Sequence, residues 1–271
     1  MKNETIKKIV LPFIVLIAVL AIWIQIANNI EDFPTPKDVY ISAFGGVNAD
    51  GDEITGVLAD PFYVANEDDK GIFWQIVNSL KRVFAGFVLA ALVGIPLGLL
   101  IGMSKNASYA FDPFIQIFKP VSPLAWLPLL LYIFQDINMT AISTIFVTSI
   151  WPIIINTALG VKNVSEDYMN VAKVLQFSPV EKVFQIILPV AVPYMFTGMR
   201  LSLGIAWLVI VAAEMLTGGI GIGFWIWDEY NNLNYPNIII GIILVGIIGY
   251  ILDLIMGKIA DYFDYRKRGR A

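Results

Sequence analysis

Six long apolar segments constrain this chain more strongly than any other feature of its sequence. A helix rises about 1.5 Å per residue and needs about 20 apolar residues to cross the hydrocarbon core of a bilayer. Segments of that length cover residues 9–27, 83–103, 114–134, 139–161, 190–216 and 238–258. The sequence therefore predicts an all-α membrane protein with about six transmembrane helices. A cleaved signal peptide is the alternative for the first segment, but no small-x-small cleavage site follows it.

Small residues recur at every fourth position in one apolar segment and predict close contact with another helix. They are Gly86, Ala90, Gly94, Gly98 and Gly102. The apolar run that contains them covers residues 71–103, which is too long for a perpendicular span. We therefore expect its first part, with Lys81 and Arg82, to lie at the membrane interface. In the next segment, prolines at positions 120, 123 and 128 predict a kinked or broken helix.

Charge is segregated between the loops and predicts the orientation of the chain. Residues 28–70 hold ten acidic residues against Lys37 and Lys70. Proline and glycine recur there, so residues 31–71 are expected to form an acidic external loop. Lysine and arginine gather in the other loops and in the tail at residues 262–271. By the positive-inside rule, both termini are predicted to be cytoplasmic, with an N-terminal transmembrane helix within residues 1–30.

The composition excludes most catalytic chemistry. The chain has no cysteine and no histidine. Disulfides, thiolate nucleophiles, Ser-His-Asp triads and the usual zinc sites are therefore ruled out, and we expect neither a catalytic nor a metal site. A net charge of −4 argues against a nucleic-acid partner. The chain also lacks a G-x-x-x-x-G-K-S/T phosphate loop, so any ATP-Mg must be bound by another chain.

The segment over residues 162–189 predicts two short helices outside the membrane. Ser165 is a suitable N-cap for the first helix. Ser178 and Glu181 form a capping box for the second, which Pro189 is expected to end. Apolar residues recur at helical spacing at Tyr168, Val171, Ala172 and Leu175, and again at Val180, Val183, Phe184 and Ile187. Such apolar faces either pack on the ends of the spans or dock on a soluble partner.

The spacing in this segment resembles the Glu-Ala-Ala-x3-Gly-x9-Ile-x-Leu-Pro loop of ABC importer permease subunits. Asn170 and Gln176 stand in the glutamate and glycine positions, and the isoleucine, leucine and proline positions match. In that family the loop docks on a cytosolic ATPase. The residues to which the resemblance assigns ATPase coupling are Asn170, Ala172, Leu175, Gln176, Phe184, Ile186, Leu188 and Pro189.

Further motifs between residues 72 and 261 are similar to the nitrate, bicarbonate and sulfonate (taurine) permease family, and closest to its nitrate branch. They include Ser79-Leu80-x-Arg82-Val83, Pro123-Leu124-Ala125-Trp126-x-Pro128-Leu129 and Gly221-Ile222-Gly223-Phe224. The resemblance implies a type I ABC importer permease core in the plasma (inner) membrane of a bacterium. It also implies two cytosolic ATPase subunits, a second permease copy in a homodimer, and an external substrate-binding lipoprotein.

Polar and aromatic residues inside the predicted spans are candidates for the translocation path. They are Arg200, Trp207, Glu214, Trp126, Thr148 and Asn156. Arg200 has either a structural role, as an ion pair or a cap on carbonyl groups, or a role in the path of the anion. A structural or gating role is favoured for Glu214, because a carboxylate repels anions, and core packing is favoured for both tryptophans. Hydroxyls and amides suit a monovalent anion, since a strongly cationic site would trap it.

One principal hypothesis follows from these observations. We expect this chain to be the membrane subunit of an ATP-driven importer that works by alternating access. The expected substrate is a small inorganic anion, nitrate (and nitrite). Bicarbonate, cyanate and sulfonate or taurine are the alternatives within this class. A gradient-driven carrier or channel is the alternative from another class, and the absence of a repeated half argues against it. We do not expect the chain to be an enzyme.

Overall fold

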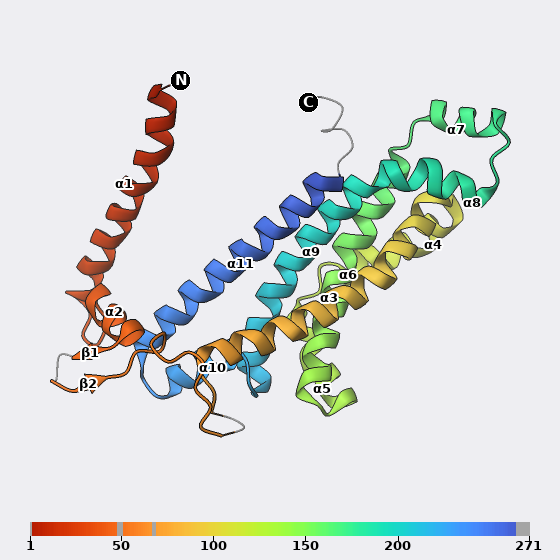
Figure 1. The fold of residues 1–271 in the computed structure, drawn as a ribbon. Coiled ribbons are helices and arrows are strands. Elements are labelled where there is room, and N and C mark those ends of the chain that lie inside the picture. The colour runs from red at the N-terminus through yellow and green to blue at the C-terminus, as the bar shows by residue number, and fades with distance from the viewer. Residues whose placement is uncertain (1, 48–50, 67–68, 264–271) are drawn as a thin grey trace. The chain divides into compact units, whose positions relative to one another are not determined.

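A computed structural model of the chain describes residues 2–47, 51–66 and 69–263, and most of these residues are helical (Figure 1). Five helices in these ranges are long and apolar enough to cross a membrane, or six if one bent pair counts as a span. They are α1 (Lys2–Ala27), α3 (Ile72–Met103), α6 (Ile137–Lys162), α9 (Leu188–Thr217) and α11 (Tyr235–Phe263). The bent pair is α4 (Lys105–Phe118) with α5 (Pro123–Phe134). The number of spans therefore agrees with the prediction.

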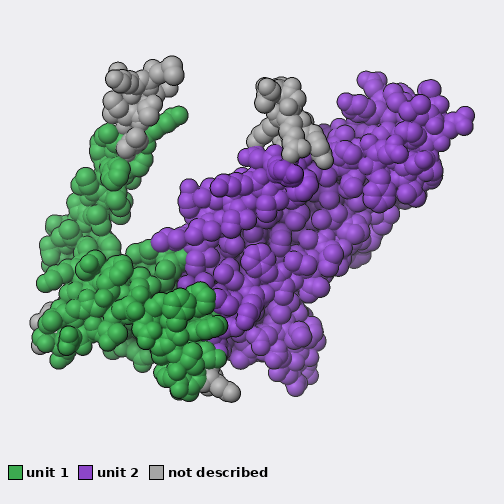
Figure 2. Space-filling view, viewed as in Figure 1, with its two compact units in different colours: residues 1–75, 225–244 green, residues 76–224, 245–271 purple. Residues whose placement is uncertain are grey.

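The chain forms two compact units, which Figure 2 shows in different colours. The first unit holds residues 1–75 and 225–244, and the second holds residues 76–224 and 245–271. Of the predicted basic tail, residues 264–271 lie outside the described residues, as do Asp50, Glu67 and Asp68 of the acidic segment.

The acidic segment of the first unit is partly folded rather than a plain solvated loop. Thr35 and Asp38 form a capping box that starts α2 (Pro36–Phe44). Strands β1 (Gly46–Val47) and β2 (Glu53–Ile54) pair in antiparallel register, with Gly46 opposite Ile54. Val39 and Ala43 of α2 are buried against Ile240. Apolar positions among the acidic ones therefore let this segment pack on its own unit.

Helix α1 keeps its apolar side chains on the surface of the first unit. None of its 18 most apolar residues is buried, and Phe13, Ile17 and Ile22 are each more than half exposed. Near its end, Trp23 Nε1 donates a hydrogen bond of 2.9 Å to the carbonyl oxygen of Pro34. An apolar helix that exposes its side chains within its own unit matches the transmembrane helix predicted within residues 1–30, with the lipid bilayer as its surroundings.

A hydrogen bond in the same unit holds a proton on Tyr63. Its hydroxyl donates to the carboxylate of Asp69, and this bond is the main reason that the pKa of Tyr63 rises to about 12. Burial raises the pKa of Glu229 above its usual value, although hydrogen bonds from Asn237 and Asn234 oppose the shift.

The core of the second unit forms where α3 and α9 pack on α6. A Cβ at Gly94 would lie 3.0 Å from Ile153, a Cβ at Gly98 would lie 2.6 Å from Thr157, and one at Gly102 would lie 2.5 Å from Val161. These contacts confirm the predicted small-residue face. They also identify its partner as α6, which the sequence pattern left open.

Helix α3 begins earlier than the predicted span. It runs unbroken from Ile72 to Met103, and Arg82 is 8% exposed within the protein. Its partner is a buried acidic residue on α9, described below. The interfacial depth expected for Lys81 and Arg82 stays a prediction.

The third apolar segment is broken, as its prolines predict. Helices α4 and α5 meet at an angle of 96°. Pro120 lies in the break, and Pro123 occupies the first turn of α5, where a missing N–H costs little. Pro128 lies inside α5 without ending it.

Two short helices follow α6, as predicted, but the second does not end at Pro189. Helix α7 (Glu166–Val174) is followed by α8 (Pro179–Lys182), which has the predicted capping box between Ser178 and Glu181. A π-helical turn over Val183–Ile187 then joins α8 directly to α9. This turn shifts the backbone hydrogen bonds by one residue, so Pro189 falls in the first turn of α9, where its missing N–H is tolerated. Figure 1 shows the two helices beyond the end of α6.

Candidate functional site

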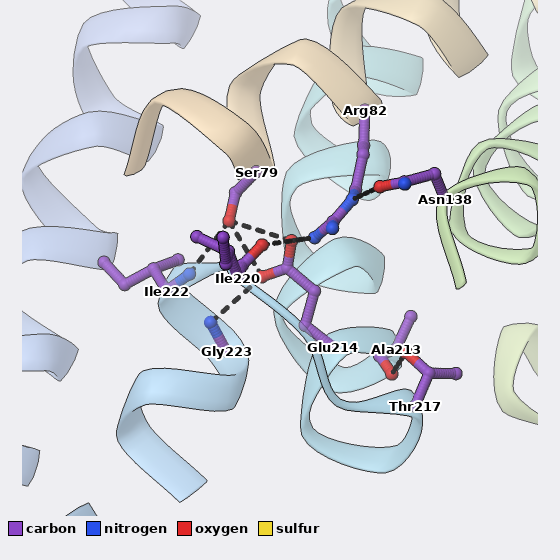
Figure 3. A network of polar contacts seen from close by, with 9 residues as sticks. All are labelled: Ser79, Arg82, Asn138, Ala213, Glu214, Thr217, Ile220, Ile222 and Gly223. Carbon is purple, nitrogen blue, oxygen red and sulfur yellow. Dashed lines mark hydrogen bonds and ion pairs between the residues drawn. The ribbon is translucent and has the colours of Figure 1, made fainter. Parts of the chain in front are cut away.

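A buried ion pair ties the end of α9 to the start of α3 (Figure 3). Arg82 Nη1 donates a hydrogen bond of 2.7 Å to Glu214 Oε1, and the Glu214 side chain is completely buried. Ser79 Oγ lies 2.8 Å from Glu214 Oε2 and also donates to the carboxylate. The N–H of Gly223 donates to the same oxygen over 3.0 Å. The carboxylate of Glu214 is therefore surrounded by donors from its own chain.

The same cluster joins two more segments of the second unit. Arg82 Nε donates to Asn138 Oδ1 over 2.8 Å, and Arg82 Nη1 also donates to the carbonyl oxygen of Ile220 over 2.8 Å. The N–H of Ile222, at the start of α10 (Ile222–Asn231), donates to Ser79 Oγ over 2.9 Å. One hydrogen-bonded cluster thus connects α3, α6, α9 and α10. Removal of either charge would leave the other buried without an opposite charge beside it.

Ser79 and Arg82 were not among the path residues proposed from the sequence. Two signals pointed to them. They are three residues apart and therefore share one face of a helix, and Arg82 is a cation in an apolar segment that needs an anion nearby. Glu214 is the matching anion in another apolar segment.

Arg200 forms the structural ion pair that was one of its two interpretations. Its guanidinium donates from Nε and Nη2 to the two carboxylate oxygens of Asp253 on α11, over 2.6 and 2.5 Å. The side chains are 46% and 47% exposed. Because both oxygens of Asp253 are engaged, Arg200 is matched in charge and geometry by its own chain.

Two further path candidates are also held by their own protein. Trp207 is 3% exposed, and its Nε1 donates over 2.9 Å to the carbonyl oxygen of Val245. Asn156 Nδ2 donates over 2.8 Å to the carbonyl oxygen of Pro152, one turn earlier in α6. The arrangement of Trp207 agrees with the favoured core packing.

The remaining two path candidates meet at one cavity. Trp126 of α5 and Thr148 of α6 line a cavity of about 280 Å³ beside the break between α4 and α5. Thr148 Oγ1 donates to the carbonyl oxygen of Thr144 on its own helix over 2.9 Å. Arg200, Trp207, Glu214 and Asn156 do not line this cavity.

The proposed coupling residues divide into a buried and an exposed group. Ala172 is fully buried, whereas Leu175 is 58% and Phe184 is 64% exposed. Asn170, Gln176 and Pro189 are exposed, and Ile186 and Leu188 are half-buried. The exposed apolar side chains include Val174 and Val180 as well, which the sequence assignment did not select.

The backbone at position 176 keeps the conformation that suits a glycine, although the residue there is glutamine. Gln176 has a φ of 52°, in the left-handed region that favours glycine. The N–H of Phe177 donates to the carbonyl oxygen of Ala172 over 2.9 Å, and that of Gln176 donates to Lys173 over 3.1 Å. These two bonds form the Schellman motif that commonly ends a helix. The turn geometry of a glycine is therefore kept without the glycine.

Comparisons with known proteins place the chain among membrane transport components. Residues 94–269 match the family described as binding-protein-dependent transport system inner membrane component. The chain is 51% identical over 205 residues to the nitrate import permease protein NrtB of Leptolyngbya laminosa, which covers 76% of this chain and 74% of that protein. It is 44% identical over 247 residues to the NrtB protein of Synechocystis sp., which covers 91% of this chain and 86% of that protein.

A bicarbonate transport system permease protein, CmpB of Synechococcus elongatus, is 39% identical over 247 residues, with 90% of this chain and 86% of that protein covered. Among solved structures, a chain of the MetNI methionine ABC transporter in inward-facing conformations has a TM-score of 0.59 at 16% identity. That match covers 71% of this chain and 95% of that chain. At this identity the likeness shows a shared fold.

Proposed function

Because this chain belongs to the family of binding-protein-dependent transport system inner membrane components, we propose that it forms the membrane pathway of an ATP-driven importer of nitrate. Its fold is that of a type I ABC importer permease. Relatives at 44% and 51% identity are named as nitrate import permeases, which supports nitrate as the substrate. Bicarbonate, cyanate and sulfonates are the alternative anions, since relatives named for bicarbonate and aliphatic sulfonates also match.

Exposed apolar side chains between α7 and the start of α9 carry the ATP-driven part of this proposal. Val174 is 81%, Leu175 is 58% and Phe184 is 64% exposed. They lie in the segment between α6 and α9, where polar residues would be expected if no protein covered them. We assign them to the docking of two cytosolic ATPase subunits, which would bind ATP-Mg and supply the energy of transport.

The proposed assembly has two copies of this chain. Both termini would lie in the cytoplasm, as the distribution of lysine and arginine favours. An external substrate-binding lipoprotein would deliver the anion to the opposite side, and the two permease copies would alternate between outward-facing and inward-facing states. In this scheme Arg200, Trp207 and Glu214 hold the helices in position, while Trp126 and Thr148 border the path of the anion.

Uptake by the reconstituted complex tests the proposal. Proteoliposomes that contain the permease and its ATPases receive the binding protein, labelled nitrate or labelled bicarbonate, and ATP on the side of the ATPases. We expect nitrate to accumulate only when ATP and the binding protein are both present. A matched complex whose ATPase binds but does not hydrolyse ATP is the control and should be inactive.

Two results would overturn the proposal in different ways. Accumulation driven by an ion gradient without ATP would favour a gradient-driven carrier. ATP-dependent uptake of bicarbonate in preference to nitrate would keep the transporter class and replace its substrate.

A further inference from the structure

The cavity beside the break between α4 and α5 lies at the middle of a span. Its walls include Lys119, Ser122 and Trp126 of the broken segment, Thr148 and Trp151 of α6, and Ile205 of α9. At about 1.5 Å per residue, Thr148 lies roughly 17 Å from the start of α6 and roughly 21 Å from its end. A bilayer core is about 30 Å thick. The cavity is therefore close to the depth at which a transported ion would be farthest from water.

Four hydrogen-bond donors around this cavity are not used by the protein. The Lys119 ammonium, the Ser122 hydroxyl and the indole N–H groups of Trp126 and Trp151 have no hydrogen-bond partner among the described residues. Ser122 is the N-cap of α5 but makes no side-chain capping bond. Lys119 and Ser122 are exposed and the two tryptophans are half-buried, so these donors are free to bind an acceptor that enters the cavity.

The remaining walls of the cavity do not supply that acceptor. No carboxylate lines it within the described part of the chain. Lys119 carries the single full charge among its lining residues, and the start of α5 adds the positive end of a helix dipole. Thr148 already gives its hydroxyl hydrogen to the carbonyl oxygen of Thr144. The electrostatics of the cavity therefore favour an anion and disfavour a cation.

Aromatic packing holds the two indoles around this space. The ring of Phe118 stacks on Trp151 with centroids 6.3 Å apart, and it contacts Trp126 with centroids 5.8 Å apart. One ring thus positions both indoles, one from α5 and one from α6. A volume of about 280 Å³ admits a small oxoanion with several waters.

We propose that this cavity is a binding site for a small monovalent oxoanion midway through the membrane, where Lys119 supplies the charge and Trp126, Trp151 and Ser122 supply neutral donors. The inference rests on the proposed function of the chain in anion import. One lysine, which is itself exposed, balances one negative charge and leaves the ion free to move on, as transport requires. The residues of this site other than Trp126 and Thr148 were not among the path residues proposed from the sequence.

A cysteine at position 119 tests the charge directly, because the natural chain has no cysteine. In the reconstituted complex with its binding protein, Lys119→Cys should lower ATP-dependent nitrate uptake about tenfold, the loss expected when one charge-assisted hydrogen bond disappears. Treatment with an aminoethyl thiosulfonate reagent puts a positive charge back and should restore uptake. The sulfonatoethyl reagent adds a negative charge and should not.

Three variants serve as controls and as a second test. Lys119→Arg should keep most of the uptake, and Lys105→Cys, at the other end of α4, should transport normally with or without either reagent. Trp151→Phe keeps the ring that stacks on Phe118 but removes the indole N–H, so uptake should fall severalfold. In every variant, co-purification of the ATPases should match that of the natural complex, and in Lys105→Cys basal ATP hydrolysis should match it as well.

The results separate this inference from the proposed function. If the natural complex does not import nitrate, the proposed function fails. If the natural complex imports nitrate and Lys119→Cys does so equally well, or if both reagents restore uptake, the anion site is wrong and the proposed function stands. If Lys119→Cys does not assemble, unchanged uptake by Trp151→Phe overturns the site.

Discussion

At the scale of single residues, Gln176 accepts a backbone conformation that suits glycine. A φ of 52° costs a residue with a side chain about 1–2 kcal/mol relative to its right-handed form. We expect Gln176→Gly to stabilise the loop locally by about 1 kcal/mol. Hydrogen exchange of the amides from 171 to 178, which reports local opening, should become slower.

Gln176→Val is the matched variant, since a β-branched residue is strained at positive φ. Its amides should exchange faster than those of the natural protein. Faster exchange in the glycine variant would show that the left-handed turn does not limit the stability of this loop.

The ion pair between Arg82 and Glu214 belongs to the same scale. Arg82→Met leaves a completely buried carboxylate without its cation, and such a change costs about 3–5 kcal/mol. The thermal unfolding midpoint of the purified protein in detergent should fall clearly. A second change, Glu214→Gln, should recover part of this loss because it removes the unpaired charge.

A double-mutant cycle supplies the control for this pair. Glu214→Gln alone leaves Arg82 buried without its anion and should also lower the midpoint. If the two losses simply add in the double variant, the charges do not depend on each other and the pair is not a structural unit.

At the scale of the elements, the small-residue face of α3 sets its distance from α6. A Cβ at Gly98 would lie 2.6 Å from Thr157 Cβ and 2.8 Å from the carbonyl oxygen of Ile154. Gly98→Ala should therefore push the helices apart and destabilise the protein by about 1–3 kcal/mol. Thermal unfolding in detergent measures this loss.

Gly204→Ala is the matched control on α9, because no atom lies within 4 Å of the added methyl group. It should leave the unfolding midpoint unchanged or raise it slightly, since alanine favours helices. A similar fall of the unfolding midpoint in both variants would mean that the loss of glycine itself, and not the contact between α3 and α6, destabilises the protein.

The segment from α7 to the start of α9, which we propose to dock on the ATPases, also belongs to this scale. Phe184 is 64% exposed on the turn that leads into α9, so Phe184→Glu should leave the fold intact. It should release the ATPase subunits, because a charge cannot enter an apolar docking groove without a partner. Co-purification of the ATPases with the permease measures this.

Lys173→Glu, an exposed polar position on α7, is the control and should retain the ATPases. Retention of the subunits and of transport-linked ATP hydrolysis by Phe184→Glu would contradict the docking assignment.

At the scale of the whole molecule, composition and local pattern predicted the architecture well. The lengths of the apolar segments predicted the spans. The prolines predicted the break near residue 120, and the capping box predicted the start of α8. These features depend on continuous stretches of the chain, which the sequence displays directly. The continuation of the chain through Pro189 was not predicted, because a single π-helical turn over Val183–Ile187 rescues a residue that normally ends a helix.

The site residues were predicted less completely. Trp126 and Thr148 were selected from the sequence and lie together at the cavity, but Trp151 and Lys119 were not selected. Lys119 lies in the break between α4 and α5, where the chain bends by 96°, and Trp151 lies on α6, so the sequence does not show that they share a cavity. Arg200 and Glu214 were selected for their charge, yet their partners Asp253 and Arg82 are 53 and 132 residues away.

The sequence by itself therefore determined the membrane class, the spans and the two short helices α7 and α8, because the lengths and periods of apolar residues follow from the bilayer and the helix. Tertiary structure decided which charges neutralise each other and which donors are left over. That division has a physical reason: a charge or donor inside an apolar bundle is satisfied by whichever group the fold brings within about 3 Å. Here the fold pairs Glu214 with Arg82 and Arg200 with Asp253. It leaves the donors around Lys119 for another acceptor.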